Sequence, residues 1–498
     1  MENKLKRMKE LIGEAFELER IAAVLDWDQQ VGMPVAAAAN RARQTSLIAS
    51  LAHEKLISSE LGELVECLVP EMDNLDPESD DYCLIKMVDR DYKRHTKVPV
   101  EHVAEFSHLT SLAHSKWESA RAGSDFLIFK DSLTKIFKMR REYADFFAPY
   151  DHVYDPLLDE FEPGMKTATL IKIFDTIRPM QVELLREIAA RPTPNHTCLE
   201  HKFATDKQWQ LANVAAAAIG YDFSRGRLDG VVHPFTTTFN LNDVRITSSA
   251  NVNNLSCISS TMHEAGHAIY EQNIYKSLEN TPLAAGVSLG MHESQSRLWE
   301  NLVGRSNSFL EFFYPKMQSS FPALKAVSLD EFYGAYNTVK PGFIRVDADE
   351  ATYNMHVMLR FELEVAMLEG SLAVADLPEA WNAKMKEYLG IIPPDDSLGC
   401  LQDVHWSAGL VGYFPTYALG NLISAQLWEA CRGKFSSLDK ALACGRFDEL
   451  RNWLSENIHC HGSKFESLEL LKRISGDGIR PEIYIKYLRE KYSAIYGL

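Results

Sequence analysis

The sequence of 498 residues lacks low-complexity linkers, internal repeats and blocks of one charge. Its 52 Lys and Arg residues are outnumbered by 69 Asp and Glu residues, which gives a formal net charge of −17. This acidic balance argues against nucleic acid or an anionic membrane surface as the main partner, because both favour a basic face. With 46% hydrophobic and 24% charged residues, the chain is typical of a globular protein with a large core.

The absence of a secretory signal and of paired cysteines indicates the cellular compartment of the protein. The first 28 residues carry charges throughout and contain no apolar core of the kind that a secretory signal needs. The eight cysteines are scattered and include no C-x-x-C pair, which is typical of a reducing environment. We therefore expect a cytoplasmic protein. His459-Cys460-His461 is interpreted as a local turn, because no second ligand pair follows at zinc-finger spacing.

One stretch could be mistaken for a membrane span. The 25 residues from Val404 to Trp428 include no Asp, Glu, Lys or Arg. They do include His405, Pro415 and Asn421, which would be costly in contact with lipid. We interpret the stretch as a buried wall of a site in a soluble protein.

Helical periodicity dominates the chain. An apolar stripe spaced by three and four residues runs from Leu5 to Ile21, and similar patterns cover 126–147, 168–190 and 358–369. Prolines at 34, 192, 194, 393 and 394 punctuate these patterns. Nothing marks a domain boundary, so we expect one mainly α domain over residues 1–498, with two helical lobes that the sequence does not separate.

The segment 233–247 departs from this pattern. It is rich in β-branched and aromatic residues, alternates with a period of two, and contains a central Asn-Leu-Asn-Asp. These features predict a short β-hairpin. The helical spacing returns over 257–273, where Ser259 to Thr261 are expected to cap the start of a helix.

This helix carries the motif His263-Glu264-Ala265-Gly266-His267. The four-residue spacing places both imidazoles on one helix face, where they can bind a single zinc ion, and Glu264 beside them can act as the general base on a metal-activated water. A chain of this histidine content contains H-E-x-x-H by chance in roughly 3–5% of cases, so the motif alone is moderate support. A third ligand is needed, and both Glu293 and Glu300 lie at suitable positions on a second predicted helix.

Further motifs make the chain resemble the carboxypeptidase Taq family of metallocarboxypeptidases over essentially its whole length. Besides H-E-x-x-H, they are His233-Pro234-Phe235, Asp243-x-Arg245-x-Thr247, His292-Glu293-Ser294-Gln295, Ile344-Arg345-x-x-Ala348-Asp349 and Gly399-x-x-Gln402-Asp403-x-His405-Trp406.

The resemblance implies a metal site of His263, His267 and Glu293, with Glu300 in a supporting role and Glu264 as the catalytic base. It also implies a helical body with a deep central groove, a small β-sheet next to the H-E-x-x-H helix, and a homodimer. The metal is expected to be zinc, one ion per chain, although two His and one Glu also accept Co²⁺ or Mn²⁺.

A carboxypeptidase must also recognise the free carboxylate at the end of its peptide substrate. Arginine suits this task because its planar fork donates two parallel hydrogen bonds. Arg345 is the first candidate, and Arg245 the second, although an internal pair with an aspartate is the more ordinary role for Arg245.

Other residues are expected to act on or beside the substrate. The tetrahedral intermediate needs a hydrogen-bond donor, for which Tyr417 and His405 are the candidates and Tyr413 is a weaker one. His233 and Gln402 are expected to line the substrate groove.

Two alternatives remain at this point. A helical zinc oligopeptidase that cuts internally or releases dipeptides would share H-E-x-x-H and the downstream Glu, but would not need an arginine for a terminal carboxylate. A non-enzymatic peptide-binding protein would be expected to lack the base or a ligand, whereas Glu264 and all three proposed ligands are present.

Overall fold

The computed structural model describes all residues from 1 to 498 and contains twenty α-helices and one small sheet. The helices of the first half are α1 (Glu2–Val31), α2 (Ala38–Leu56), α3 (Ser59–Leu68), α4 (Asp80–Lys97), α5 (Val100–Gly123), α6 (Leu127–Asp145), α7 (Asp155–Leu158), α8 (Thr167–Ala189) and α9 (Thr205–Ile219). Those of the second half are α10 (Ser256–Gln272), α11 (Leu289–Arg297), α12 (Asn307–Ser320), α13 (Leu329–Tyr336), α14 (Tyr353–Glu369), α15 (Leu377–Leu389), α16 (Pro415–Lys434), α17 (Leu438–Ala443), α18 (Asp448–Asn457), α19 (Ser467–Ser475) and α20 (Pro481–Tyr496).

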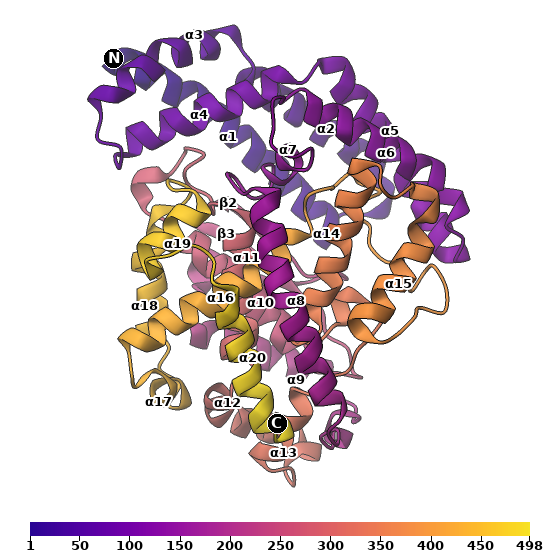
Figure 1. The fold of residues 1–498 in the computed structure, drawn as a ribbon. Coiled ribbons are helices and arrows are strands. Elements are labelled where there is room, and N and C mark those ends of the chain that lie inside the picture. Colours follow the sequence, from indigo (N-terminus) through magenta and orange to yellow (C-terminus); the bar gives the residue numbers. More distant parts are fainter.

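The N-terminal helices α1 to α6 lie across one end of the molecule, and the chain ends at the opposite end with α20 (Figure 1). Between these ends lie the sheet and the helices α10, α11 and α16. One continuous hydrophobic core of 113 buried residues includes side chains from both ends. The mainly α architecture predicted from periodicity is confirmed.

The predicted helices occur within a few residues of their expected limits. The first ends at Val31, ahead of Pro34, and α8 runs through Pro179 without ending there. The apolar stripe predicted along α1 is buried only in the N-terminal half of the helix. Leu5 and Met8 are buried, but Ile21 is 47% exposed.

The sheet has three strands in the order β1-β3-β2. The predicted hairpin is confirmed as β2 (Thr236–Asn240) and β3 (Asp243–Ser248), which pair antiparallel with Thr236 opposite Ile246. The sequence did not reveal β1 (Leu228–Gly230), which pairs parallel to β3. Three residues with a central Asp and a terminal Gly give no strand pattern.

The helix that carries H-E-x-x-H begins earlier than expected. In α10 the first residue is Ser256, whose backbone N–H and hydroxyl both donate to the side chain of Asn254. The prediction that Ser259 to Thr261 cap this helix was therefore wrong, since these residues lie inside it.

The uncharged stretch from Val404 to Trp428 forms a loop and most of α16, and residues 418–428 are all buried. It lies inside the protein against α11, α14 and α20. Across the whole chain, the helices fall short of the length and apolarity that a bilayer span requires.

Two glycines allow three helices to approach closely at the centre of the fold. A Cβ on Gly266 of α10 would lie 2.7 Å from the backbone oxygen of Gln295 in α11. A Cβ on Gly420 of α16 would lie 2.5 Å from Cγ of Glu293, also in α11. The fold therefore holds α11 between two helix faces that have no side chain at the point of contact.

Candidate metal centre and active-site groove

The two histidines of α10 face α11 at the centre of the molecule. Their rings lie 5.0 Å apart, one helical turn from each other. Glu293 of α11 directs Oε2 at both, at 3.6 Å from Nε2 of His263 and 3.4 Å from Nε2 of His267. The three residues offer ligand atoms that all lie within 4.8 Å of one another.

These distances fit a divalent metal. Ligand atoms at about 2.0–2.1 Å from a tetrahedral ion lie about 3.4 Å from one another, which is close to both observed separations. Two imidazoles and one carboxylate also leave a fourth position open, as catalytic zinc sites require. The donor set and its spacing therefore suit a catalytic metal.

Glu300 has a different place from Glu293. Its Oε2 lies 2.9 Å from Nδ1 of His263, on the side of the ring that faces away from Glu293. An imidazole that donates Nδ1–H to a carboxylate keeps its Nε2 lone pair for a metal. Glu300 therefore orients His263, and it lies in a π-helical segment, Leu298–Val303, that follows α11.

His267 is oriented by a chain of two further groups. Its Nδ1 lies 2.6 Å from Nδ1 of His292, and Nε2 of His292 lies 2.8 Å from Oε1 of Glu271. The carboxylate can only accept when it is ionised, so Nε2 of His292 is the donor to Glu271. Nδ1 of a neutral His292 then accepts from Nδ1–H of His267, which again leaves Nε2 of His267 free.

Arg297 connects the two carboxylates. Its Nε donates to Oε1 of Glu293 at 2.7 Å, and its Nη1 donates to Oε2 of Glu300 at 3.2 Å. Although burial opposes ionisation, the Arg297 charge together with His263 holds the pKa of Glu293 well below its usual range and that of Glu300 at about 2. Both carboxylates are therefore ionised at neutral pH.

The carboxylates act differently on the two histidines. Burial lowers the pKa of His263, but the charges of Glu293 and Glu300 outweigh it and raise the pKa to about 9. Burial dominates at His267 and lowers its pKa to about 4. The two ionised carboxylates therefore favour positive charge at His263, whereas burial keeps His267 neutral.

Glu264 lies beside the two histidines and is held by the sheet. Thr236 of β2 donates its hydroxyl to Oε2 of Glu264 at 2.6 Å, while Oε1 accepts no hydrogen bond from the protein. Burial raises the pKa of this carboxyl group. The small sheet therefore fixes one oxygen of Glu264 and leaves the other available for a proton.

A groove of about 620 Å³ opens onto this centre. Its lining includes His263, Glu293 and Arg297 of the centre, Ser259 and Pro234 near them in sequence, and several residues distant in sequence. The latter are Arg305, Tyr336, Arg345, Tyr353 and Tyr417.

Arg345 belongs to a buried charge cluster on the groove wall. Its Nε and Nη2 donate to Oδ1 of Asp403 at 3.0 and 2.9 Å, and Nη1 donates to the Tyr353 hydroxyl at 2.8 Å. Arg360 donates to the other oxygen of Asp403 at 2.7 Å. Two guanidinium groups share a single carboxylate, so the cluster retains one positive charge next to the groove.

Arg305 is a groove residue that the sequence analysis missed. Its Nη1 donates to the backbone oxygen of Tyr336 at 2.9 Å and its guanidinium lies 4.8 Å from the Tyr336 ring. No carboxylate pairs with it within 4.0 Å, unlike Arg297 and Arg345. It lies in none of the recognised motifs, so no signal in the sequence distinguished it from a surface arginine.

Tyr417 lines the groove, and His405 lies behind it. Nε2 of His405 is 3.2 Å from the Tyr417 hydroxyl, and burial lowers the pKa of His405 to about 4, so this ring is neutral. Tyr413 packs against Tyr417 with ring centroids 5.4 Å apart, and does not line the groove.

The other proposed substrate residues make different contacts. Arg245 forms a two-point ion pair with Asp243 and lies between the rings of Trp27 and Phe239. Gln402 accepts from the backbone N–H of Arg345, and its amide donates to three backbone oxygens. His233 is exposed, next to Pro234 of the groove wall.

His459-Cys460-His461 forms a single 3₁₀ turn, as predicted. Nε2 of His459 lies 2.9 Å from Oε1 of Gln295, which places this turn behind α11. Its contacts therefore support the helix that carries Glu293.

Comparison with known proteins identifies the family. Residues 7–492 match the carboxypeptidase Taq (M32) metallopeptidase family. The chain belongs to this family. It is 36% identical to carboxypeptidase 1 of Bacillus subtilis, with 99% of each chain covered, and 38% identical to thermostable carboxypeptidase 1 of Thermus thermophilus, with 96% of each covered.

Solved structures agree with this assignment. The M32 carboxypeptidase of Deinococcus radiodurans superimposes with a TM-score of 0.97 at 38% identity, and covers 100% of both chains. Metallocarboxypeptidase 1 of Trypanosoma cruzi gives a TM-score of 0.93 at 31% identity, with 99% of this chain and 100% of that chain covered. The protein is therefore a metal-dependent carboxypeptidase that hydrolyses peptides, and the oligopeptidase alternative is not favoured.

Proposed function

We propose that this metallocarboxypeptidase removes single C-terminal residues from peptides, with His263, His267 and Glu293 as ligands of one zinc ion and Glu264 as the general base. The observation that carries the proposal is the meeting of three ligand atoms at 3.4 and 3.6 Å, two of them from residues that line a groove, with the buried carboxylate of Glu264 on the same helix as the histidines. Co²⁺ and Mn²⁺ are expected to replace zinc, because the donor set accepts them. When bound, the metal supplies a Lewis acid that polarises the scissile carbonyl and makes water more acidic.

Glu264 moves the proton. Its Oε1, free of protein donors, takes a proton from the attacking water and later delivers it to the departing amine. Thr236 keeps the other oxygen fixed during both steps, so the carboxylate does not rotate away from the reacting atoms.

The substrate carboxylate is recognised by the excess positive charge of the groove wall. Arg345 is the favoured residue because it and Arg360 share Asp403, which leaves one uncompensated charge beside the groove. Arg305 is the second candidate, since it has no carboxylate partner of its own.

Tyr417 is proposed to donate its hydroxyl to the oxyanion that forms during attack. His405 is a positioning residue, since it touches the Tyr417 hydroxyl and not the groove. Gln402 and Arg245 are likewise assigned to positioning, through the Arg345 backbone and the hairpin respectively. His233 is assigned to the outer part of the groove next to Pro234.

A pair of peptides tests the proposal. An N-acetylated peptide of ten residues and its C-amidated twin are incubated with the metal-loaded enzyme and followed by mass spectrometry. We expect a ladder of single-residue losses from the free acid only, and a decrease in kcat of about 10²–10⁴-fold in Glu264→Gln. Equal internal cuts in both peptides would contradict the exopeptidase assignment.

The two arginines are separated by the same assay. If Arg345 binds the carboxylate, Arg345→Ala lowers kcat/KM for the free acid by about 100-fold, and Arg305→Ala has a smaller effect. The opposite order would assign the carboxylate to Arg305. Circular dichroism checks that each variant is still folded, because Arg345→Ala removes one of the two partners of buried Asp403.

We also propose that the protein acts as a homodimer in the cytoplasm and folds as a single unit. The continuous core supports one unit, and eight cysteines without a disulfide suit a reducing compartment. Exposed apolar side chains at Ile21 and Val24 of α1, and at Leu47 and Leu51 of α2, support an interface on this helix pair. Leu47→Glu is expected to convert the dimer to a monomer in light scattering.

A further inference from the structure

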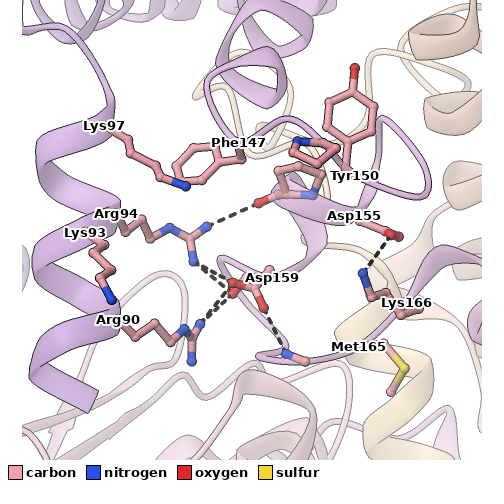
Figure 2. A pocket seen from close by; sticks show the side chains of 13 residues that line it. Arg90, Lys93, Arg94, Lys97, Phe147, Tyr150, Asp155, Asp159, Met165 and Lys166 are labelled. Atoms are coloured by element: carbon pink, nitrogen blue, oxygen red, sulfur yellow. Dashed lines mark hydrogen bonds and ion pairs between the residues drawn. The ribbon is translucent and has the colours of Figure 1, made fainter. Parts of the chain in front are cut away.

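A second cavity lies apart from the groove and shares no lining residue with it. It has a volume of about 330 Å³ and lies between the last two turns of α4 and the segment from Phe147 to Lys166. Figure 2 shows the basic side chains of α4 along one wall, Asp159 near the centre, and Tyr150, Asp155 and Lys166 on the far side.

The lining of this cavity has the opposite charge to the rest of the protein. Five basic and two acidic residues give it a formal charge of +3, in a chain whose net charge is −17. Four of the cations are Arg90, Lys93, Arg94 and Lys97, which follow one another on a single face of α4 at i, i+3, i+4 and i+7. Like charges on successive turns repel each other, so this face is stabilised by an anion.

The two carboxylates of the cavity are already engaged. Asp159 accepts from Arg90 and Arg94 at 3.1 Å each, and also from the backbone N–H of Gly164 at 2.9 Å. Asp155 accepts from the backbone and the hydroxyl of Thr167. Neither can neutralise the remaining cations of α4.

Several donors of α4 remain available. Lys97 pairs with no carboxylate, and Lys93 pairs only with half-buried Asp89, one turn back on the same helix. Nε and Nη1 of Arg90 make no hydrogen bond within the protein, since only Nη2 donates to Asp159. Lys97 and one side of the Arg90 guanidinium therefore lack a carboxylate partner, and Lys93 has one only on its own helix.

Part of the lining is apolar and lies next to the cations of α4. The Phe147 ring lies 5.5 Å from Nζ of Lys97, and Pro149, Tyr150 and Met165 continue this surface. Tyr150 directs its hydroxyl to Asp145, outside the cavity, at 2.7 Å. A flat apolar group can therefore pack on Phe147 while an anionic group next to it reaches α4.

We propose that this cavity binds a small organic phosphate, with the phosphate on Arg90, Lys93 and Lys97 and a flat apolar part against Phe147. A phosphate monoester carries up to two negative charges and three acceptor oxygens, which match the free donors and the formal charge of +3 better than a carboxylate does. The cavity volume lies within the range of small-molecule sites.

Isothermal titration calorimetry of the metal-loaded enzyme tests this site, with phenyl phosphate, inorganic phosphate and benzoate as probes. We expect phenyl phosphate to bind most tightly, since only it offers both the phosphate and the ring. The double variant Lys93→Ala/Lys97→Ala should weaken its binding by about tenfold, because two exposed charge contacts are lost. Lys135→Ala, which removes an exposed lysine of α6 outside the cavity, is the matched control and should bind as the wild type does.

The groove is an alternative place for the same probe, so Arg345→Ala is titrated in parallel. Binding that is unchanged in Arg345→Ala and weakened in the lysine variant supports the proposal. Binding lost in Arg345→Ala, binding equal in the lysine variant and the wild type, or no heat with phenyl phosphate overturns it. Benzoate that binds as tightly as phenyl phosphate overturns the assignment to phosphate.

Discussion

Replacing Gly420 by alanine tests whether helix packing sets the metal centre. The added Cβ would lie 2.5 Å from Cγ and 2.7 Å from Cβ of Glu293. Ordinary contacts begin near 3.4 Å, so α16 or the Glu293 side chain must move by about 0.9 Å. Overpacking of this kind costs about 1–3 kcal/mol of unfolding free energy, and a misplacement near 1 Å at a reacting centre lowers the rate by about 100-fold.

The measurement is kcat/KM on an N-acylated dipeptide, with metal content and thermal unfolding determined on the same preparation. Gly433→Ala is the matched control, because Gly433 belongs to the same helix and a Cβ there meets nothing within 4 Å. We expect Gly420→Ala to lose about 100-fold in kcat/KM and to bind metal more weakly, while Gly433→Ala keeps full activity. A Gly420→Ala enzyme with wild-type activity and metal affinity would refute the reasoning that this contact fixes Glu293.

Three further predictions concern the same region. Glu300→Ala should weaken metal binding by about 10–100-fold without abolishing it, because His263 loses the acceptor that orients its ring. Equilibrium dialysis measures the metal affinity, and an unchanged affinity would contradict this role of Glu300. Chelation should abolish peptide hydrolysis, and Zn²⁺, Co²⁺ or Mn²⁺ should restore it; activity that survives complete metal removal would contradict the catalytic role of the centre. Glu162 accepts a hydrogen bond from the backbone N–H of Gly290 in α11. Burial raises the pKa of Glu162 to about 7, so the folded state holds the proton of this carboxyl group more strongly than the unfolded state does. Its stabilising effect is present below about pH 4.5 and is lost as pH rises through 7, by up to about 3 kcal/mol. Urea unfolding at pH 6 and pH 8.5 should therefore show Glu162→Gln gaining stability relative to the wild type at the higher pH, and an equal difference at both pH values would contradict the shift.

The helices and the hairpin could be predicted because they depend on local patterns. The 3.6-residue spacing of apolar residues fixed α6, α8 and α14, and alternation with a central turn predicted β2 and β3. Features without such a local pattern were not predicted. The strand β1 is three residues long and exists because β3 offers it a partner. For α10 only the capping residue was missed, since Ser256 donates to the side chain of Asn254.

By itself, the sequence determined the chemistry at the centre. Two histidines four residues apart must share one helix face, and a glutamate between them must lie near that face, whatever the rest of the fold does. Motif spacing left open the choice between Glu293 and Glu300, since both belong to the same stretch of chain and carry the same group, and only the family resemblance favoured Glu293.

Only the tertiary structure gives the physical reason to prefer Glu293, because the choice depends on which ring nitrogen each carboxylate approaches. Glu293 faces both Nε2 atoms, and Glu300 faces Nδ1 of His263. The same holds for the arginines. Whether a guanidinium is neutralised depends on carboxylates that are distant in sequence. Arg345 and Arg360 share the single carboxylate of Asp403. A local sequence pattern cannot predict this, because the number of charged partners is set by how the whole chain folds.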